Sequence, residues 1–144
     1  MDILSIAIII FCIMELGNVL ILYFMPDSRL GNGVAVFDSW NDVKEDKALN
    51  LFSHYIAYWV AGVKLIFIFL LIVVLLTGTE ITRVWAVVAM ILSIATYFWC
   101  LHPIIKELDK MGKITPKGYS KTLGLMIMGF LIMFLLSLII YFIV

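Results

Sequence analysis

Four long apolar runs, separated by polar stretches, dominate the hydropathy pattern of the chain. They cover, approximately, residues 3–25, 51–77, 81–102 and 119–144. Each run is long enough to supply the roughly 20 apolar residues that a helix needs to cross the hydrocarbon core of a bilayer. Because unpaired backbone groups cannot face lipid, each run is expected to be helical. The pattern predicts an all-α integral membrane protein: one domain over residues 1–144, built as an antiparallel bundle of four transmembrane helices.

The connection over residues 26–50 carries the signs of a short amphipathic helix. Ser39 and Asp42 have the spacing of a capping box, which would start this helix. Phe37, Trp40 and Val43 recur every three residues and give it one apolar face. We expect this helix to lie in the membrane interface with Trp40 as its anchor. An ordinary amphipathic linker is the alternative.

A second interfacial helix is predicted over residues 103–112. Pro103 follows the third apolar run, and apolar and charged positions then alternate around a helical turn. Gly112 is placed to stop this helix. Thr115 has the character of an N-cap, with Pro116 at the first position of the fourth helix.

Composition supports the membrane interpretation. Of 144 residues, 65% are hydrophobic and 14% are charged, whereas soluble domains are roughly half apolar and a quarter charged. The first run is expected to be a retained helix rather than a signal peptide, because no Lys or Arg precedes it and no small-residue cleavage site follows it.

The distribution of charge predicts the orientation of the chain. The net charge is zero, so no nucleic-acid partner is expected. The two longer connections and their edges carry nearly all the basic residues: Arg29, Lys44, Lys47, Lys106, Lys110, Lys113, Lys117 and Lys121. Only Arg83 lies near the other side. The basic connections should be cytoplasmic and both termini non-cytoplasmic, and the five lysines from Lys106 onward can attract anionic lipid headgroups.

Two ionisable residues, Glu15 and Lys64, fall inside the apolar runs. A charge in mid-bilayer costs about 2.5–3.5 kcal/mol on insertion scales. Counted at ~1.5 Å per residue, Glu15 lies about 15 Å from the cytoplasmic end of the first run, and Lys64 lies about 12 Å from the same face if the apolar part of the second run begins near Ile56. We therefore expect an ion pair, with Asn18 on the same stripe as Glu15. The pair either fixes helix register or makes Glu15 a proton- or cation-responsive carboxylate; lipid-facing charges, or a counter-charge from a partner subunit, are the remaining possibilities.

Small residues recur at helical spacing on two further runs. Ser53, Ala57 and Ala61 lie four apart, and Ala86, Ala89, Ser93, Thr96 and Cys100 alternate steps of three and four. Small side chains let helix backbones approach closely. Both stripes are therefore predicted to face the interior of the bundle.

A polar and aromatic cluster is expected at the cytoplasmic side. It comprises His54, His102, Tyr55 and Trp40. Two histidines at one depth could ligate haem or a metal, but neither is matched by a further ligand at suitable spacing. We predict interfacial side chains with no metal and no cofactor.

No catalytic motif is present in the sequence, which leaves three functional hypotheses. The first is a non-catalytic subunit or assembly factor that acts by helix association, as a homo-oligomer or within a larger membrane complex. The second is a small oligomeric ion- or proton-coupled transporter or channel that uses Glu15. A carboxylate in the first span of a small four-helix protein is similar to the pattern of the small multidrug resistance transporters. Those chains have shorter loops and no intramembrane lysine paired with the glutamate. The third is a membrane-embedded lipid-modifying enzyme.

Overall fold

The computed structural model describes residues 2–30 and 32–143, and these residues are almost entirely helical. The helices are α1 (Ile3–Phe24), α2 (Ser39–Asp42), α3 (Lys47–Thr77), α4 (Glu80–Lys110) and α5 (Tyr119–Ile143), with 3-10 turns η1 (Val34–Val36) and η2 (Val43–Glu45). Within these ranges no strand occurs, only a single antiparallel bridge between Phe37 and Ile114. Helices α1, α3, α4 and α5 are each long and apolar enough to cross a membrane. The four predicted apolar helices are confirmed.

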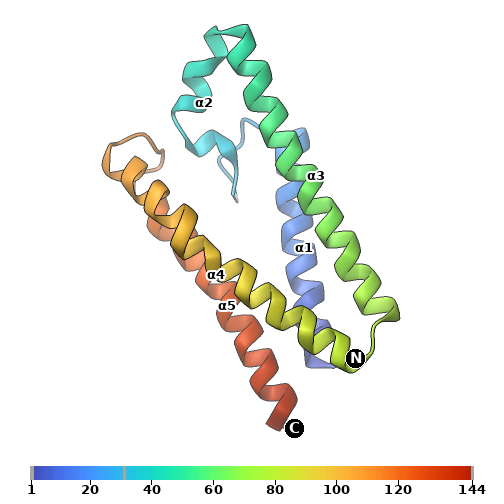
Figure 1. Cartoon of the computed structure of the whole chain (residues 1–144). Helices are drawn as coiled ribbons and strands as arrows, with labels where there is room; N and C mark the ends of the chain where they lie inside the picture. The colour runs from blue at the N-terminus through green and yellow to red at the C-terminus, as the bar shows by residue number, and fades with distance from the viewer. Residues whose placement is uncertain (1, 31, 144) are drawn as a thin grey trace.

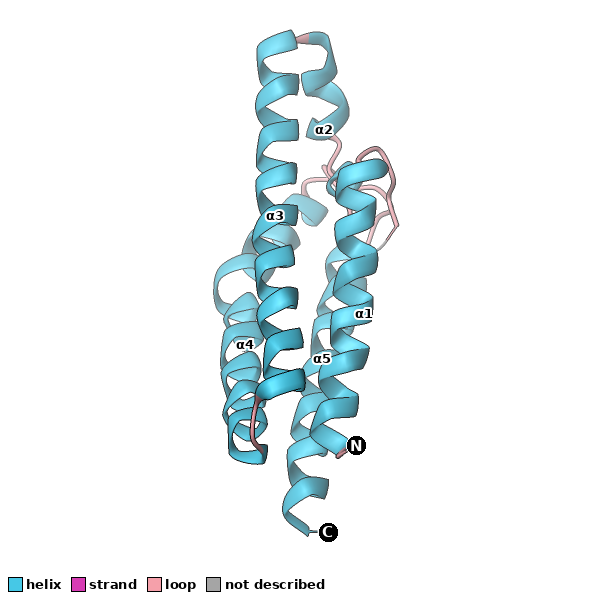
Figure 2. Cartoon of the chain, turned by 90° about the vertical axis from the view of Figure 1, so that its right-hand side faces the viewer, coloured by secondary structure: helices cyan, strands magenta, loops and turns pink. Residues whose placement is uncertain are grey.

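The long helices lie in two pairs. Helix α3 runs beside α1, and α4 runs beside α5 (Figure 1). The pairs meet at the end that carries both termini and diverge toward the other end (Figure 1). Figure 2 shows the short elements around α2 at that other end, beside the start of α3.

Side chains cap three of the long helices. The Asp2 carboxylate accepts from the Ser5 amide at 2.7 Å and begins α1. Asp46 accepts from Ala48 and Leu49 at the start of α3 at 2.8 and 3.1 Å, and Thr79 is the N-cap of α4. Each cap satisfies amides that have no partner inside the helix.

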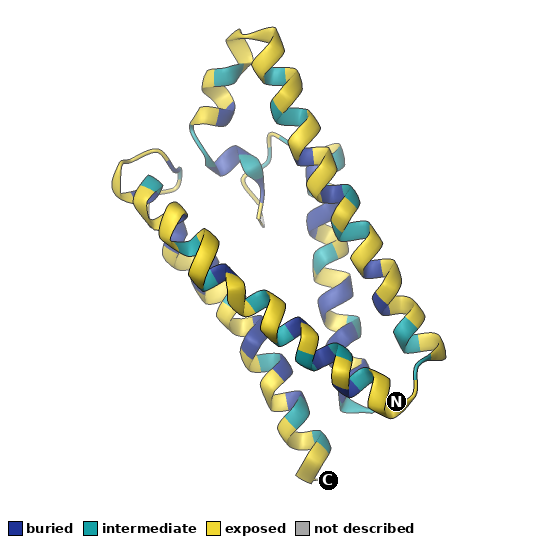
Figure 3. Cartoon of the chain, in the orientation of Figure 1, coloured by how far each residue is buried: buried dark blue, intermediate teal, exposed yellow. Residues whose placement is uncertain are grey.

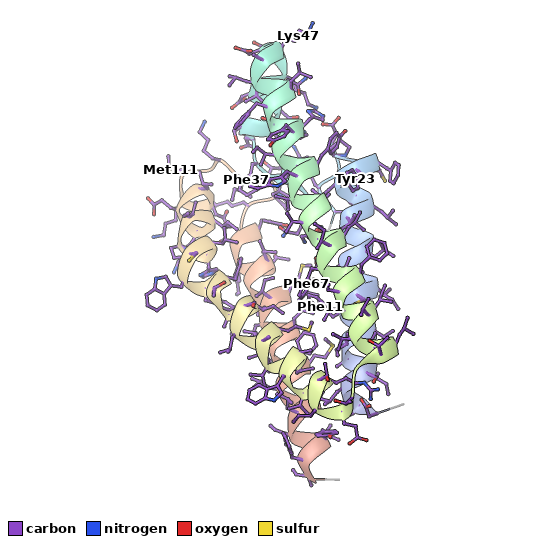
Figure 4. All side chains as sticks on the ribbon, turned by 45° about the vertical axis from the view of Figure 1, so that its right-hand side comes forward. Phe11, Tyr23, Phe37, Lys47, Phe67 and Met111 are labelled. Atoms are coloured by element: carbon purple, nitrogen blue, oxygen red, sulfur yellow. The ribbon has the colours of Figure 1, made fainter. Side chains whose placement is uncertain are left out.

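An aromatic cluster joins the two helix pairs. The ring of Phe11 on α1 lies 6.1 Å from that of Phe67 on α3 (Figure 4). It also lies 5.1 Å from Phe130 and 5.5 Å from Phe134 on α5. The outward faces of the helices are largely exposed along their length (Figure 3), and much of that surface is apolar, as expected of helices solvated by lipid.

The short helix in the first connection exists, but it packs on protein. Helix α2 begins at Ser39, and no side chain caps it, so the predicted capping box is wrong. Trp40 is 7% exposed, and its indole N–H donates to Asp27 at 2.8 Å. The expected interfacial anchor is therefore a buried side chain, because its ring packs with Ala35 and Ala57 and its N–H has a partner in the Asp27 carboxylate.

Helix α4 continues through Pro103 to Lys110. The predicted separate interfacial helix over 103–112 is instead the last part of α4. Membrane helices tolerate proline where neighbouring groups compensate, and the continuation is held by Ile105, which packs with Tyr97 and Leu123. Gly112, just beyond the helix, adopts the left-handed φ of +68° that favours glycine there.

The start of α5 is organised by Asp109 rather than by Thr115. The Asp109 carboxylate accepts from the Gly118 amide at 2.9 Å, the Ser120 amide at 3.0 Å and the Ser120 hydroxyl at 2.5 Å. Thr115 instead binds the first connection, through its amide to Val36 at 2.8 Å and its hydroxyl to Asp38 at 2.9 Å. The predicted N-cap role of Thr115 is wrong because its polar groups bridge the two connections.

Both ends of the molecule are tied by polar contacts between elements distant in sequence. At the end with the termini, Arg83 of α4 forms an ion pair with Asp2 and donates to the Gly78 carbonyl at 3.2 Å. At the other end, the Asp38 amide donates to the Lys113 carbonyl at 3.0 Å. The helix pairs are thus linked at both ends.

Candidate functional site

Three polar side chains meet midway along α1 and α3. The Lys64 ammonium donates to Glu15 Oε2 at 2.6 Å and to Asn18 Oδ1 at 2.7 Å. Glu15 and Asn18 lie three residues apart on α1 and therefore share one face. The structure brings together the three residues that the sequence predicts as an intramembrane polar set, hereafter the Glu15–Asn18–Lys64 triad.

Small residues on α3 allow this contact. Ala57 and Ala61 are 2% and 0% exposed, and they precede Lys64 on nearly the same face. Ser53 is half-buried one turn earlier. Because alanine side chains let neighbouring backbones approach closely, the Lys64 stem can reach across to α1.

The triad leaves one polar group without a partner. The side chains of Glu15 and Lys64 are 19% and 24% exposed and neutralise each other. Asn18 is 8% exposed. Lys64 offers only donors, so the Asn18 carbonyl must face it. The Asn18 Nδ2 group is consequently directed elsewhere, and it is buried with no hydrogen-bond partner.

A cavity of about 280 Å³ lies next to the triad, between α1 and α5. Its lining comes mostly from apolar side chains of the two helices, with Glu15, Asn18 and Asn32 as the polar members: Met14, Glu15, Gly17, Asn18, Ile21, Asn32, Leu123, Met126, Ile127 and Phe130. The sequence does not single out the α5 residues, because that run is uniformly apolar. Gly17, an isolated glycine inside a helical run, is the one signal that could have indicated the cavity.

The small-residue stripe of α4 does not face the interior. Ala89, Ser93 and Thr96 are exposed, as is Cys100, and Ala86 is half-buried. The buried face of α4 instead carries larger side chains: Val84, Val87, Met90, Tyr97 and Ile105. The predicted inward stripe is wrong because burying larger apolar side chains gives more contact per residue.

The two histidines belong to different helix pairs. His54 lies 4.9 Å from the Trp40 ring and 6.0 Å from the Tyr58 ring, and its Nδ1 lies 2.9 Å from the Asn50 carbonyl oxygen. His102 lies 5.8 Å from the Tyr97 ring, and a Cβ added at Gly124 of α5 would meet its Nε2 at 3.4 Å. Each histidine therefore has its own, separate packing partners.

The expected cytoplasmic-side cluster is accordingly only partly assembled. The rings of Trp40 and His54 are in contact at a tilt of 42°, but Tyr55 is 61% exposed and His102 lies on the other helix pair. Within residues 2–30 and 32–143, no group of three or more His, Cys, Asp or Glu side chains is placed to hold a metal ion.

Outside the long helices, Asp27 is the best-defined titratable group. Hydrogen bonds from Lys44 and Trp40 lower the pKa of its carboxyl below the ordinary value. Lys44 Nζ lies 2.7 Å from the Asp27 carboxylate. These contacts fix the first connection where it leaves α1.

These features define a class: a multi-pass helical membrane protein with a charge-paired triad between its first two spans and a cavity beside it. No protein-family model matches the chain, and neither a curated protein nor a solved structure does.

Proposed function

We propose that this chain is a non-catalytic membrane subunit or assembly factor that acts by helix association, as a homo-oligomer or within a larger complex. Its four long helices cross the bilayer as an antiparallel bundle that forms one domain. The connections 26–50 and 103–118 lie on the cytoplasmic side, where the lysines from Lys106 onward meet anionic headgroups. Both termini lie on the opposite side.

The observation that carries this proposal is the outward direction of the small-residue stripe on α4. Ala89, Ser93, Thr96 and Cys100 repeat at steps of three and four, and all four are exposed. This spacing keeps the 3.5-residue period of a left-handed helix pair. In a bilayer, helices associate through close packing of small residues rather than through hydrophobic transfer. The stripe therefore offers a seam for a helix from another chain.

The test introduces a large side chain into this seam. Ala89→Trp and Ser93→Trp should each weaken association at least about tenfold, a change of roughly 1.4 kcal/mol. The readout is the mass of the species extracted from native membranes in mild detergent and separated by native electrophoresis. Leu70→Trp, on the outer surface of α3 where Leu70 is 60% exposed, is the matched control.

Two results would contradict helix association through α4. One is a wild-type chain that migrates as a single copy with nothing attached. The other is an assembly whose mass is unchanged in both α4 variants. Retained helical circular dichroism and expression would show that the variants fold.

A proton- or cation-coupled transporter is the second candidate, because Glu15 contributes to the cavity wall as well as to the triad. Protons or cations must be able to reach a carboxylate that cycles between charged and neutral forms, and a cavity of this kind would give them access. Glu15→Gln should then abolish proton-coupled flux in proteoliposomes while leaving folding intact. Absence of flux in the wild type would remove this candidate.

A further inference from the structure

We propose that the pocket between the end of α4 and the start of α5 binds the phosphate monoester of a lipid, as in phosphatidic acid. The site rests on the proposed contact between the basic connections and anionic headgroups, and it adds which lysines bind and which phosphate they select. The pocket holds about 290 Å³ and lies at the end of α4 that Met111 marks in Figure 4. Its lining combines three lysines with the residues that cap α5: Lys106, Asp109, Lys110, Lys117, Gly118 and Ser120.

The three lysines of this pocket have no carboxylate to neutralise them. Over the part of the chain that the structure describes, the ion pairs all involve other basic residues. Lys106 and Lys110 lie four residues apart on α4, where like charges repel because they share one helix face. An anion placed between these two ammonium groups and that of Lys117 would turn the repulsion into attraction.

The buried members of the lining leave the binding of an anion to the lysines. Asp109 and Ser120 are 8% and 9% exposed. The Asp109 carboxylate accepts from the Gly118 and Ser120 amides and from the Ser120 hydroxyl. These amides at the start of α5 are therefore occupied and do not serve as an anion site of the helix N-terminus. An anion here must be held by ammonium groups, which bind phosphate as point charges.

The charge of the lining matches a phosphate monoester better than a diester. Three lysines and the one carboxylate of Asp109 give the lining a net charge of +2, since three donated hydrogen bonds favour the ionised carboxylate. A phosphate monoester carries about −1.5 to −2 at pH 7. The phosphate diester of most phospholipids carries a single negative charge. Only the monoester can neutralise the lining.

The position along α4 puts these lysines at the level of lipid phosphates. The third apolar run ends at His102, and Lys106 lies four residues further on, or about 6 Å at 1.5 Å per residue. The headgroup layer on each side of the hydrocarbon core is about 5–8 Å thick. The flexible stems of Lys110 and Lys117 can bring their ammonium groups toward the same layer. This depth favours a lipid over a phosphate dissolved in water.

Native mass spectrometry of the purified chain in mild detergent tests the lipid and its charge. The spectra count the lipids bound to each copy, and a titration gives the Kd. Dioleoyl phosphatidic acid should bind about fivefold more tightly than dioleoyl phosphatidylmethanol, a diester with the same acyl chains. The reason is that one unit of charge beside membrane-surface lysines is worth about a fivefold change in affinity.

Lysines inside and outside the pocket give matched variants. Lys110→Gln and Lys117→Gln should each weaken the binding of phosphatidic acid about fivefold. Lys113→Gln and Lys121→Gln remove the same charge close by but outside the lining, and they should leave the Kd nearly unchanged. All four side chains are exposed, so loss of fold does not explain a difference between the two pairs. Helical circular dichroism checks this.

Three results would overturn the proposal. Equal losses of affinity in Lys113→Gln and Lys110→Gln would assign binding to the overall positive charge of this end rather than to the pocket. Equal affinity for the two lipids, or no binding of either, would remove the selection of a phosphate monoester. Displacement of phosphatidic acid by an equal concentration of glycerol 3-phosphate would show that the pocket takes soluble phosphates.

The same spectra separate this site from helix association through α4. Ala89→Trp, about 25 Å from Lys106 along the helix at 1.5 Å per residue, should lower the number of copies in the assembly and leave the lipid affinity unchanged. Lys117→Gln should lower the lipid affinity and leave the number of copies unchanged. Either function can therefore fail while the other holds.

Discussion

At the scale of single residues, the contacts of Lys64 explain how a charged group can be accommodated midway along α3. Its ammonium is held by Glu15 at 2.6 Å and Asn18 at 2.7 Å, so each charge has a partner within reach. Removing one partner leaves the other charge in an apolar environment. Removing both charged side chains leaves no unpaired charge.

We expect Lys64→Met to destabilise the protein by about 2.5–3.5 kcal/mol, the cost of an unpaired charge in the membrane. Glu15→Met combined with Lys64→Met should recover more than half of that loss, because apolar replacements of a buried pair are often nearly neutral. Unfolding in mixed micelles with increasing denaturing detergent measures both variants.

A double variant no more stable than Lys64→Met would mean that the pair contributes through a packing role of the Lys64 stem rather than through charge neutralisation. Val63→Met, at the neighbouring exposed position of α3, is the control for the methionine side chain itself.

At the scale of elements, the beginnings of the helices depend on carboxylates that the sequence pattern does not reveal. Asp109 is 8% exposed and belongs to the end of α4, yet its hydrogen bonds go to the first residues of α5. It joins the two helices of the pair at one end.

Asp109→Ala should therefore lower the free energy of unfolding by about 1–2 kcal/mol, as expected for the loss of a helix N-cap. Amide exchange at Gly118 and Ser120 should accelerate more than exchange in the middle of α5. Glu107→Ala, an exposed change on the same turn, should leave both quantities unchanged. Equal exchange rates in the two variants would contradict a capping role for Asp109.

The first connection should respond to acid through Asp27. Its pKa is lowered by hydrogen bonds from Lys44 and Trp40, so its stabilising contribution is complete above the ordinary carboxyl pKa of ~4 and disappears as the pH falls through the lower folded value. Below about pH 4 the contact to Trp40 should weaken. The difference in fluorescence between the wild type and Trp40→Phe should then change.

In Asp27→Asn this acid-dependent change should be absent, since the side chain no longer titrates. A change of the same size in that variant would assign the effect to another group.

At the scale of the whole molecule, the proposed orientation makes a direct prediction. Lys113→Cys in the connection before α5 should react with a membrane-impermeant maleimide only after permeabilisation of cells. Glu80→Cys, at the start of α4, should react in intact cells, because the basic side is retained in the cytoplasm. Reactivity in the reverse order would invert the topology. Cys12, which is buried, should contribute little background, and Cys100→Ser removes the exposed thiol.

The sequence by itself determined which segments become long helices and which two charges meet. Apolar runs of membrane-spanning length admit only helices, and consecutive helices usually lie side by side in space, as α1 and α3 do. Because an unpaired charge in that environment is costly, Glu15 and Lys64 at similar depth on adjacent helices had a strong reason to pair.

Only the tertiary structure decided which faces of the apolar helices turn inward. Lipid tails are as apolar as leucine side chains, so hydropathy does not distinguish a residue that faces lipid from one that faces a helix. This is why the stripe of Ala89, Ser93 and Thr96, whose spacing predicts an inward face, is exposed. The cavity beside Asn18 depends on where α5 packs against α1, which the nearly uniform apolar sequence of α5 leaves open.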